Sequence, residues 1–389
     1  TLPLYNVNIF WKDTVIGATT NDMGHFHIKR PTNDSHTLIV SYIGFENDTL
    51  IVEENESSVS IFMKDLKSTE EVYITANKPH EIRDIKTALN TEIITDAGLQ
   101  TMACCTLAES FENSAAVDVE QADAISGAKR IKMLGLAGFY TQLMIEKKPV
   151  MRGLVSPFSM EYLPGSWIEA ISISKGTSSV ATGYESITGQ INVELKKPET
   201  SDAPMLNLYQ NSMGRSELVF TGARKLNDNV STMLLGYASY NQKKWDTNND
   251  TFLDMPLVSH FNIMNRWKFK SGNKVGQVGF KVIRDNRKGG QQNAAFEKPT
   301  SSFLPYASKN ETARYEAYAK GGFSLDENGS SIGLVLSAFH HDQESYWGLK
   351  NYSGKESSFY SNLTANKIIN RHTFSAGASY TFNDRHEIY

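Results

Sequence analysis

Two adjacent cysteines, Cys104 and Cys105, are the side chains of this 389-residue chain best suited to bind a soft metal. They precede Thr106 and Glu109, whose spacing is typical of the capping box at the start of a helix, so we expect a helix from Thr106. The positive end of a helix dipole favours the thiolate form of nearby cysteines, and thiolates select soft metals such as Cu(I). Two thiols do not complete a tetrahedral site, so a structural or redox role stays open beside soft-metal binding.

A second group of candidate ligands lies in an acidic stretch that predicts a loop. Oxygen atoms recur at alternate positions there, from Asp246, Asn248, Asp250, the carbonyl of Phe252, and Asp254. This set could wrap a structural Ca²⁺ ion. The pattern of an EF-hand is incomplete, because Thr251 replaces the turn glycine and Leu257 replaces the bidentate glutamate. A calcium site and an ordinary solvated loop are therefore both open, and no other cofactor is expected.

Two further patterns resemble parts of enzymes. His341 and Glu344 have the His-x-x-Glu spacing of a zinc-binding pair, but no third ligand is identifiable, and His25 and His27 share one face of an expected strand. Phosphate-binding loops, dinucleotide fingerprints and nucleophile elbows are absent from the sequence. The sequence therefore predicts a protein that is not an enzyme.

Composition narrows the class of protein. Hydrophobic residues make up 40% of the chain and charged residues 21%, the net charge is −4, and there are only two cysteines. No apolar run reaches the roughly 18 residues of a transmembrane helix. Basic residues are scattered and do not form a patch, so we expect no nucleic-acid partner. Two cysteines exclude a disulfide framework.

The elements that must position these residues are mostly strands. Residues 1–64 contain short β-rich runs separated by turn clusters, which indicates a small antiparallel sandwich. Residues 199–389 contain about nine long strands in hairpins, with an apolar face that includes Phe261 and Phe269 and a polar face that includes His260 and Arg266. Such alternation predicts a transmembrane β-barrel wall, although a large soluble β-sandwich also alternates.

The connections in residues 199–389 are expected to alternate in length, as in outer-membrane barrels. Short turns are predicted at 226–229, 271–274 and 326–329, and long polar loops near 242–257, 287–312 and 342–356.

Residues 90–198 resemble the plug domain of TonB-dependent outer-membrane receptors of the Bacteroidetes type, through segments such as RIKMLGL (130–136) and GQINVEL (189–195). The segments TTNDMGHFHI (19–28) and LIVSYIGFE (38–46) resemble the carboxypeptidase-regulatory-like domain that precedes many of these receptors. The resemblance implies a mainly β fold: an N-terminal β-sandwich (1–64), a linker (65–89), an α+β plug (90–198), and the first part of a transmembrane antiparallel β-barrel (199–389). Since the family's barrel needs more strands, we expect the chain to be a fragment.

The linker carries a segment that resembles a TonB box, formed by Glu71, Val72, Tyr73, Ile74, Thr75 and Ala76. Such a segment pairs as an added strand with the edge of a TonB sheet, which needs free backbone groups and no proline. The alternative is an ordinary terminal strand of the sandwich.

The resemblance also suggests where ligand first touches the plug: Leu136, Tyr140, Met151, Arg152 and Phe158. Arg152 offers several donors to an anionic ligand, or it pairs with a carboxylate of the barrel wall.

The function implied by the resemblance is TonB-dependent active import of a scarce ligand across the outer membrane. The ligand would be a metal chelate such as a siderophore, or a soft metal such as copper. The implied partners are TonB with its inner-membrane motor proteins, outer-membrane lipid, a small extracellular ligand and a surface lipoprotein, with the N-terminal domain and TonB box in the periplasm. Open alternatives are an adhesion or signalling receptor without transport, and a glycan or peptide importer.

Overall fold

The computed structural model describes most of the chain, and all statements below concern its described residues. The following residues fall outside them: 1–2, 5, 22, 32–35, 43–44, 46, 54–55, 64–80, 85–89, 96–97, 100–105, 112–113, 115, 178–182, 184, 200–203, 299, 327–328 and 370–371. The TonB-box segment and the two cysteines are among these, so the predictions made for them stay predictions. No helix in the described part of the chain is long and apolar enough to cross a membrane.

The N-terminal domain is a small antiparallel sheet with a second, extended layer. Its strands are β1 (Asn8–Trp11), β2 (Gly17–Thr19), β3 (Thr37–Ser41) and β4 (Asp48–Ile51), in the order β2-β1-β3-β4. Ile9, Trp11, Leu38 and Val40 form its buried centre, against which side chains from residues 26–28 and 59–63 pack. Alternating apolar residues on short strands explain this core, as the sequence predicted.

The central region, residues 90–198, is built from two sheets and short 3-10 helices, and the strand β5, which precedes residue 90, pairs with the edge of its first sheet. The first sheet has the order β10-β12-β11-β6-β5, with β5 (Glu81–Asp84), β6 (Asn90–Thr95), β10 (Thr141–Ile145), β11 (Ile168–Lys175) and β12 (Gly189–Leu195). The second sheet contains β7 (Val117–Asp123), β8 (Ala128–Met133) and β9 (Leu136–Ala137). The 3-10 helices are η1 (Glu109–Phe111), η2 (Gly138–Tyr140), η3 (Gly153–Phe158) and η4 (Gly165–Trp167).

The helix expected from Thr106 is not present in the form predicted. The described residues there form the single 3-10 turn of η1, and Thr106 bridges to Pro164 as a short strand contact. The Thr106 hydroxyl is buried without a hydrogen-bond partner in the described part of the chain, so it does not cap a helix. Tertiary pairing with Pro164 has prevailed over the local capping pattern.

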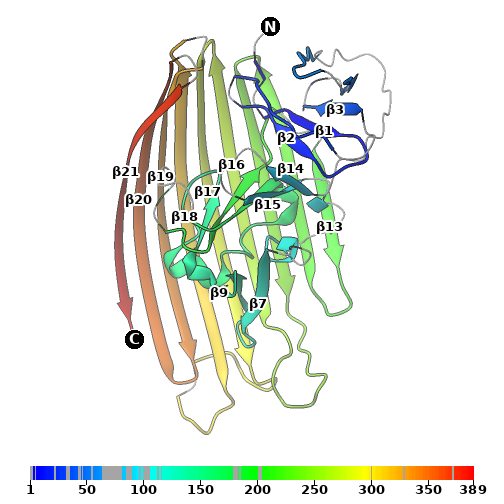
Figure 1. Ribbon diagram of the computed structural model, residues 1–389. Helices are drawn as coiled ribbons and strands as arrows, with labels where there is room; N and C mark the ends of the chain where they lie inside the picture. Colours follow the sequence, from blue (N-terminus) through cyan, green and yellow to red (C-terminus); the bar gives the residue numbers. More distant parts are fainter. Residues whose placement is uncertain are drawn as a thin grey trace.

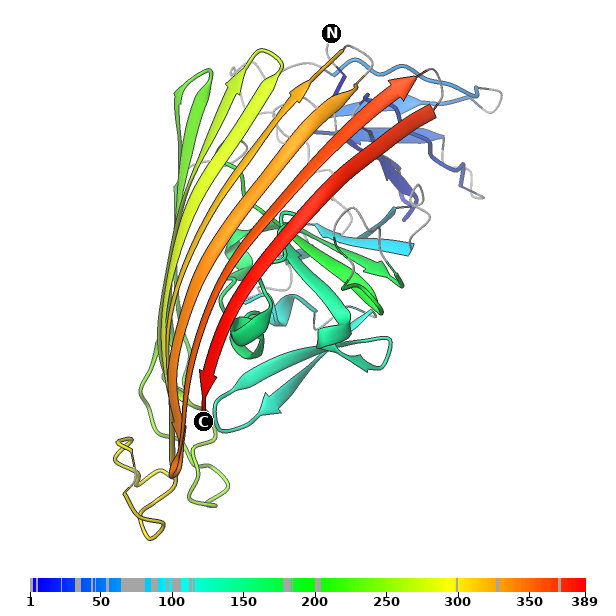
Figure 2. The same ribbon diagram turned by 90° about the vertical axis from the view of Figure 1, so that its left-hand side faces the viewer.

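A single antiparallel sheet of nine strands, called the wall below, forms the C-terminal half. Its strands follow chain order: β13 (Met205–Gln210), β14 (Ser216–Asn227), β15 (Val230–Asn241), β16 (Leu257–Ser271), β17 (Lys274–Gly290), β18 (Ala307–Ser324), β19 (Ser331–Trp347), β20 (Lys350–Ile369) and β21 (His372–Ile388). The wall curves around the central region (Figure 2). Nine strands confirm the number expected from the sequence.

Side chains of the wall alternate as predicted. On β16, His260, Asn262 and Arg266 are buried against the central region, whereas Phe261 and Phe269 on the other face are 46% and 41% exposed. The polar face therefore lies inside the curve and the apolar face outside, as a barrel in lipid requires.

Two of the three predicted long loops are confirmed. Long connections join β15 to β16 and β17 to β18, whereas β19 and β20 meet in a tight turn in which Trp347 pairs with Lys350. The loop predicted near 342–356 is wrong, because Gly348 adopts a φ of +55° that closes a two-residue turn and its polar flanks continue as strands. Figure 1 shows the N-terminal domain near the wall's short-turn end, opposite the long connections.

Candidate functional site

The tip of the β8–β9 hairpin is an exposed apolar surface. Leu134 and Gly135 have φ values of +53° and +77°, which fits the two-residue hairpin turn that joins β8 to β9. Leu134, Leu136 and Phe139 are 61%, 47% and 76% exposed, and Phe139 contacts the ring of Tyr140. The other end of β8 is the one near the long connections, because Gly127 of the β7–β8 turn lies against Pro256 of the β15–β16 connection. We call Leu134, Leu136, Phe139 and Tyr140 the apolar tip.

The other residues expected to contact ligand lie deeper. Met151 and Phe158 are buried, and the Phe158 ring lies 4.5 Å beneath the guanidinium of Arg287 on β17. Arg152 Nη1 lies 2.6 Å from Glu185 Oε1, so its partner is a carboxylate of the central region and not of the wall. The structure thus brings Leu136 and Tyr140 together at the tip and places Met151 and Phe158 in the interior.

The central region meets the wall along a buried seam of charged and polar contacts. At one end of it, the turn after β10 has positive φ at Glu146 and Lys147, and the bridge between Ile145 and Lys148 closes it. The Glu146 carboxylate lies 2.7 Å from Arg266 of β16, 3.0 Å from Lys320 of β18 and 3.3 Å from Lys148. One buried carboxylate therefore holds three cations, two of them from the wall.

The pKa values of Glu146 and Lys148, the two groups that the central region contributes to this cluster, are both lowered. Burial raises the pKa of Glu146, but the three cations outweigh it and hold that pKa well below its usual range. Burial lowers the pKa of Lys148 to about 7, against the opposing effect of Glu146. Lys148 also lies 3.7 Å from the centre of the Tyr318 ring, a cation–π contact.

A second set of seam contacts is centred on Asp285 of β17. Its Oδ1 lies 3.1 Å from Nδ1 of His260, and its Oδ2 accepts hydrogen bonds from the Tyr162 hydroxyl and the Arg287 guanidinium at 3.0 and 2.7 Å. Arg287 also pairs with Glu161 at 2.6 Å. Tyr162 and Glu161 belong to the central region, so this network again joins it to the wall.

Wall side chains also bind the backbone of the central region. Arg266 Nη1 donates to the Lys196 carbonyl at 3.1 Å, Arg314 Nη2 donates to the Val150 carbonyl at 2.7 Å, and the Leu154 amide donates to Glu356 at 2.9 Å. These contacts satisfy buried groups that would otherwise be left without partners. The seam therefore pairs particular side chains with particular backbone groups, and some of them, such as Arg266 and Arg314, are fully buried. It contains no covalent link among the described residues.

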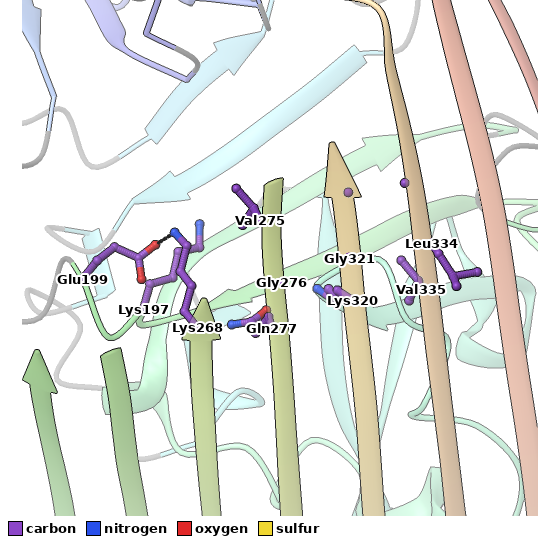
Figure 3. A pocket seen from close by; sticks show the side chains of 12 residues that line it. Lys197, Glu199, Lys268, Val275, Gly276, Gln277, Lys320, Gly321, Leu334 and Val335 are labelled. Carbon is purple, nitrogen blue, oxygen red and sulfur yellow. Dashed lines mark hydrogen bonds and ion pairs between the residues drawn. The ribbon is translucent and has the colours of Figure 1, made fainter. Parts of the chain in front are cut away.

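A cavity of about 300 Å³ lies between the end of the central region and the wall. Figure 3 shows Lys197 and Glu199 facing Lys268, Gln277 and Lys320, with an ion pair between Glu199 and Lys268. Gly276, Gly321, Gly322 and Gly333 form part of its lining. Without side chains at these four positions, a gap remains beside the seam.

The acidic loop predicted to bind calcium folds around its own backbone. The Asp246 carboxylate accepts hydrogen bonds from the amides of Asp250 and Thr251, and Asp254 accepts from the amide and hydroxyl of Thr247. Thr251, which replaces the EF-hand glycine, has a φ of +74°. These hydrogen bonds hold the loop together, and the calcium site, including Asn248 and Phe252, stays a prediction.

The enzyme-like histidine patterns do not form sites in the structure. His341 faces the interior and is 1% exposed, whereas Glu344 lies on the opposite face of β19 and accepts from Ser353. Residues three apart on a strand point to opposite faces, so this pair cannot share a metal. His25 and His27 are both exposed. In the described part of the chain no group of three or more histidine, cysteine, aspartate or glutamate side chains is arranged to hold a metal.

Sequence reasoning missed the role of Glu146 and Asp285. Period-two alternation placed His260 and Arg266 on the inner face, but their partners depend on how the central region docks. The only local signal was the run Glu146-Lys147-Lys148 directly after an apolar strand, which is typical of a turn and says nothing about burial.

Comparisons with known proteins agree with this architecture. Residues 1–74 match the model of the CarboxypepD_reg-like domain. Solved structures with a similar fold include the siderophore receptor PiuA from Acinetobacter baumannii (12% identity, TM-score 0.59, 77% of this chain and 46% of that chain). Others are the ferripyoverdine receptor of the outer membrane of Pseudomonas aeruginosa (14%, 0.60, 79% and 44%) and the ferric yersiniabactin uptake receptor FyuA from Yersinia pestis (10%, 0.58, 77% and 49%). A comparison with curated proteins finds no match.

At these identities the likeness shows the fold alone. The chain has the plug-and-barrel architecture of such receptors, preceded by a carboxypeptidase-regulatory-like domain, and the expected fold class is confirmed. The chain spans about half the length of the solved structures that it matches.

Proposed function

We propose that this protein acts in TonB-dependent import of a metal chelate, such as a ferric siderophore, across the outer membrane. The observation that carries the proposal is the seam: the central region fills the inner side of a barrel wall and is held there by ion pairs, hydrogen bonds and shared apolar packing, without a covalent link among the described residues. Such contacts can break and re-form, so a mechanical pull could rearrange the central region without any chemical step. The similar structures, which are siderophore receptors, support this cargo class.

In this proposal each part has a separate task. Ligand contacts the long connections, which face the outside, and the apolar tip, and the segment from Glu71 to Ala76 pairs with TonB in the periplasm. The wall contacts outer-membrane lipid through its apolar outer face, where Phe280 is 62% exposed. Energy comes from the inner membrane through TonB, so we assign no catalytic residue.

Uptake by cells tests the proposal. The gene would be deleted, and cell-associated iron, copper, zinc and cobalt measured by mass spectrometry under metal limitation after complementation with wild type, Ile74→Pro or Ile74→Val. Proline removes a backbone donor that strand addition to TonB requires, whereas valine preserves it. We expect one metal to fall on deletion and to be restored by wild type and Ile74→Val but not by Ile74→Pro.

Other outcomes assign the protein to another class. Ligand binding without energised uptake, equal in both Ile74 variants, would identify an adhesion or signalling receptor. No change in any metal would contradict metal import and direct the search to glycans and peptides.

A further inference from the structure

An apolar groove lies on the outer face of the wall, at its short-turn end. It has a volume of about 600 Å³ and is lined by residues of β15 to β19. Directly paired residues form a row across four of these strands: Phe269 of β16, Gly276 of β17, Gly321 of β18 and Leu334 of β19. All four positions belong to the outer face, because Phe269 does and directly paired residues share a face of the sheet. The row therefore has an apolar side chain at each end and none between them.

Neither backbone conformation nor packing requires glycine at the two middle positions. Gly276 and Gly321 are not among the glycines with a positive φ. A Cβ atom added at Gly276 would come no closer than 3.8 Å to an atom beyond the adjacent residues, and one at Gly321 would meet nothing within 4 Å. Glycine weakens a strand, because it loses more backbone entropy on folding and packs no side chain. Two paired glycines that larger residues could replace indicate that another molecule approaches the backbone here.

One end of the groove is basic. The described residues that line it include Lys270 and Lys274, on either side of the β16–β17 turn, and no carboxylate. Both lysines are exposed. By contrast, Lys225, beside the neighbouring β14–β15 turn, pairs with Asp228 at 2.9 Å. The charge at this end of the groove therefore suits an anion.

An apolar trough that ends in two lysines has the chemistry of a lipid site. We propose that the groove binds one anionic phospholipid, with an acyl chain over Gly276 and Gly321 and the phosphate at Lys270 and Lys274. The outer face of a barrel lies in hydrocarbon, which supplies the acyl chain. Lysines at a membrane surface attract anionic headgroups. The groove lies where these two environments meet, because the apolar face continues from Gly276 to Phe280, which is 62% exposed.

This inference rests on the membrane location of the wall under the proposed function, and it adds a bound lipid at the periplasmic end. Binding can be measured without transport, because Trp267 provides a probe beside the groove. Trp267 lies two residues before Phe269 on the same face of β16. Bromine atoms on a lipid chain quench tryptophan fluorescence on contact.

The protein would be purified from outer membranes in mild detergent and titrated with dibrominated phosphatidylglycerol, which is anionic. A second titration would use dibrominated phosphatidylethanolamine, which is zwitterionic. The signal is the part of the fluorescence that Trp267→Phe removes. We expect quenching that saturates, with phosphatidylglycerol bound at least tenfold more tightly.

Two changes separate the headgroup from the chain. Replacing Lys270 and Lys274 together by glutamine should lower the affinity for phosphatidylglycerol about tenfold or more, since each lysine near anionic lipid contributes about a factor of five. The affinity for phosphatidylethanolamine should stay the same. Gly321→Val should lower the affinity for both lipids, because its side chain occupies the groove.

Two matched controls should bind as wild type does. Lys225→Gln removes a lysine at the same end of the wall that has a carboxylate partner. Gly236→Val adds a side chain at another glycine of the wall, in β15 outside the groove, where a Cβ atom would meet Phe220 at 3.7 Å. If Gly321→Val fails to assemble, the double lysine variant still decides, because both lysines are exposed at a turn.

Quenching that rises without saturating, equally in Gly321→Val and Gly236→Val, would overturn the proposal and leave only the lipid that surrounds any barrel. Equal affinity of wild type for the two lipids would also overturn it, since no headgroup would then be recognised. These results are separate from the uptake experiment. Lipid can bind although no metal changes on deletion of the gene, and metal uptake can depend on Ile74 although no lipid binds in the groove.

Discussion

At the scale of single residues, Glu146 is the carboxylate of the seam that pairs with three cations. Replacing it by glutamine removes the counter-charge of Lys148 and Arg266, which are buried, and of Lys320, whose side chain is 23% exposed. Removing one partner of a buried ion pair costs about 3–5 kcal/mol, because the remaining charge has lost its water. We therefore expect Glu146→Gln to lower the free energy of unfolding by that amount, measured from urea midpoints, and to make the central region sensitive to protease.

Glu120 provides a matched control for this prediction. It also pairs with two cations, Arg130 and Lys132, but its side chain is 28% exposed and those of its partners are 57% and 39% exposed. Exposed pairs contribute little because water screens them, so Glu120→Gln should change the urea midpoint little. Equal effects of the two substitutions would show that the Glu146 cluster is not buried as the structure has it.

Lys148 makes a prediction about pH. Its pKa is lowered from 10.5 to about 7, first by burial. Between these values the unfolded chain binds a proton that the folded chain does not, so the contribution of Lys148 to stability rises with pH across this window. The slope is at most about 1.4 kcal/mol per pH unit.

The variant Lys148→Met removes this slope. The free energy of unfolding of wild type minus that of Lys148→Met should therefore increase from pH 7 to pH 10, as measured by urea unfolding at each pH. A difference that stays constant over this range would mean that Lys148 is charged in the folded protein throughout.

At the scale of elements, the apolar tip follows from the geometry of one hairpin. Phe139 is exposed, so Phe139→Ser removes little packing and should leave stability unchanged. If ligand covers this ring, the lost burial is worth about 1.5–3 kcal/mol, roughly a tenfold to hundredfold loss of affinity. Binding of labelled ferric siderophore to whole cells measures this loss of affinity.

Ile51→Ser, at a 72% exposed position in β4, is the control and should bind as wild type does. Unchanged binding by Phe139→Ser would remove the tip from the ligand site.

The elements were predictable to the extent that local periodicity determines them. Alternation on β16 gave both the strand and its buried face, because every second side chain meets the central region. The two wrong expectations had local patterns that tertiary contacts overrode: Thr106 pairs with Pro164 and does not cap a helix, and Gly348 turns the chain within a stretch rich in loop-forming residues.

The candidate site was less predictable than the elements. The tip could be proposed from the resemblance, whereas Glu146 meets Arg266 and Lys320, and Asp285 meets Tyr162, across more than a hundred residues of chain. Their meeting depends on the parallel pairing of β10 with β12 and on the depth at which the central region lies in the wall. No pattern within either segment encodes that depth.

At the scale of the whole molecule, the central region and the wall share one hydrophobic core, whereas the N-terminal domain has another. Ile171 and Ile191 of the central region belong to one core together with Leu235 and Met264 of the wall. The N-terminal domain has its own core around Trp11, with no described member from residues 90–389. The central region and wall should therefore unfold together, and the N-terminal domain separately.

Deletion of residues 1–64 tests this division. Because the deletion removes a separate core, the remaining protein should assemble in the outer membrane and unfold within about 1 kcal/mol of wild type, judged by heat-modified mobility on gels and urea midpoints. Deletion of residues 90–198 should instead uncover Arg266, Arg314 and Asp285, and leave a wall that proteases digest readily. If loss of the N-terminal domain alone prevented assembly, its contact with the wall, where Met23 lies against Gly329, would be structural and not incidental.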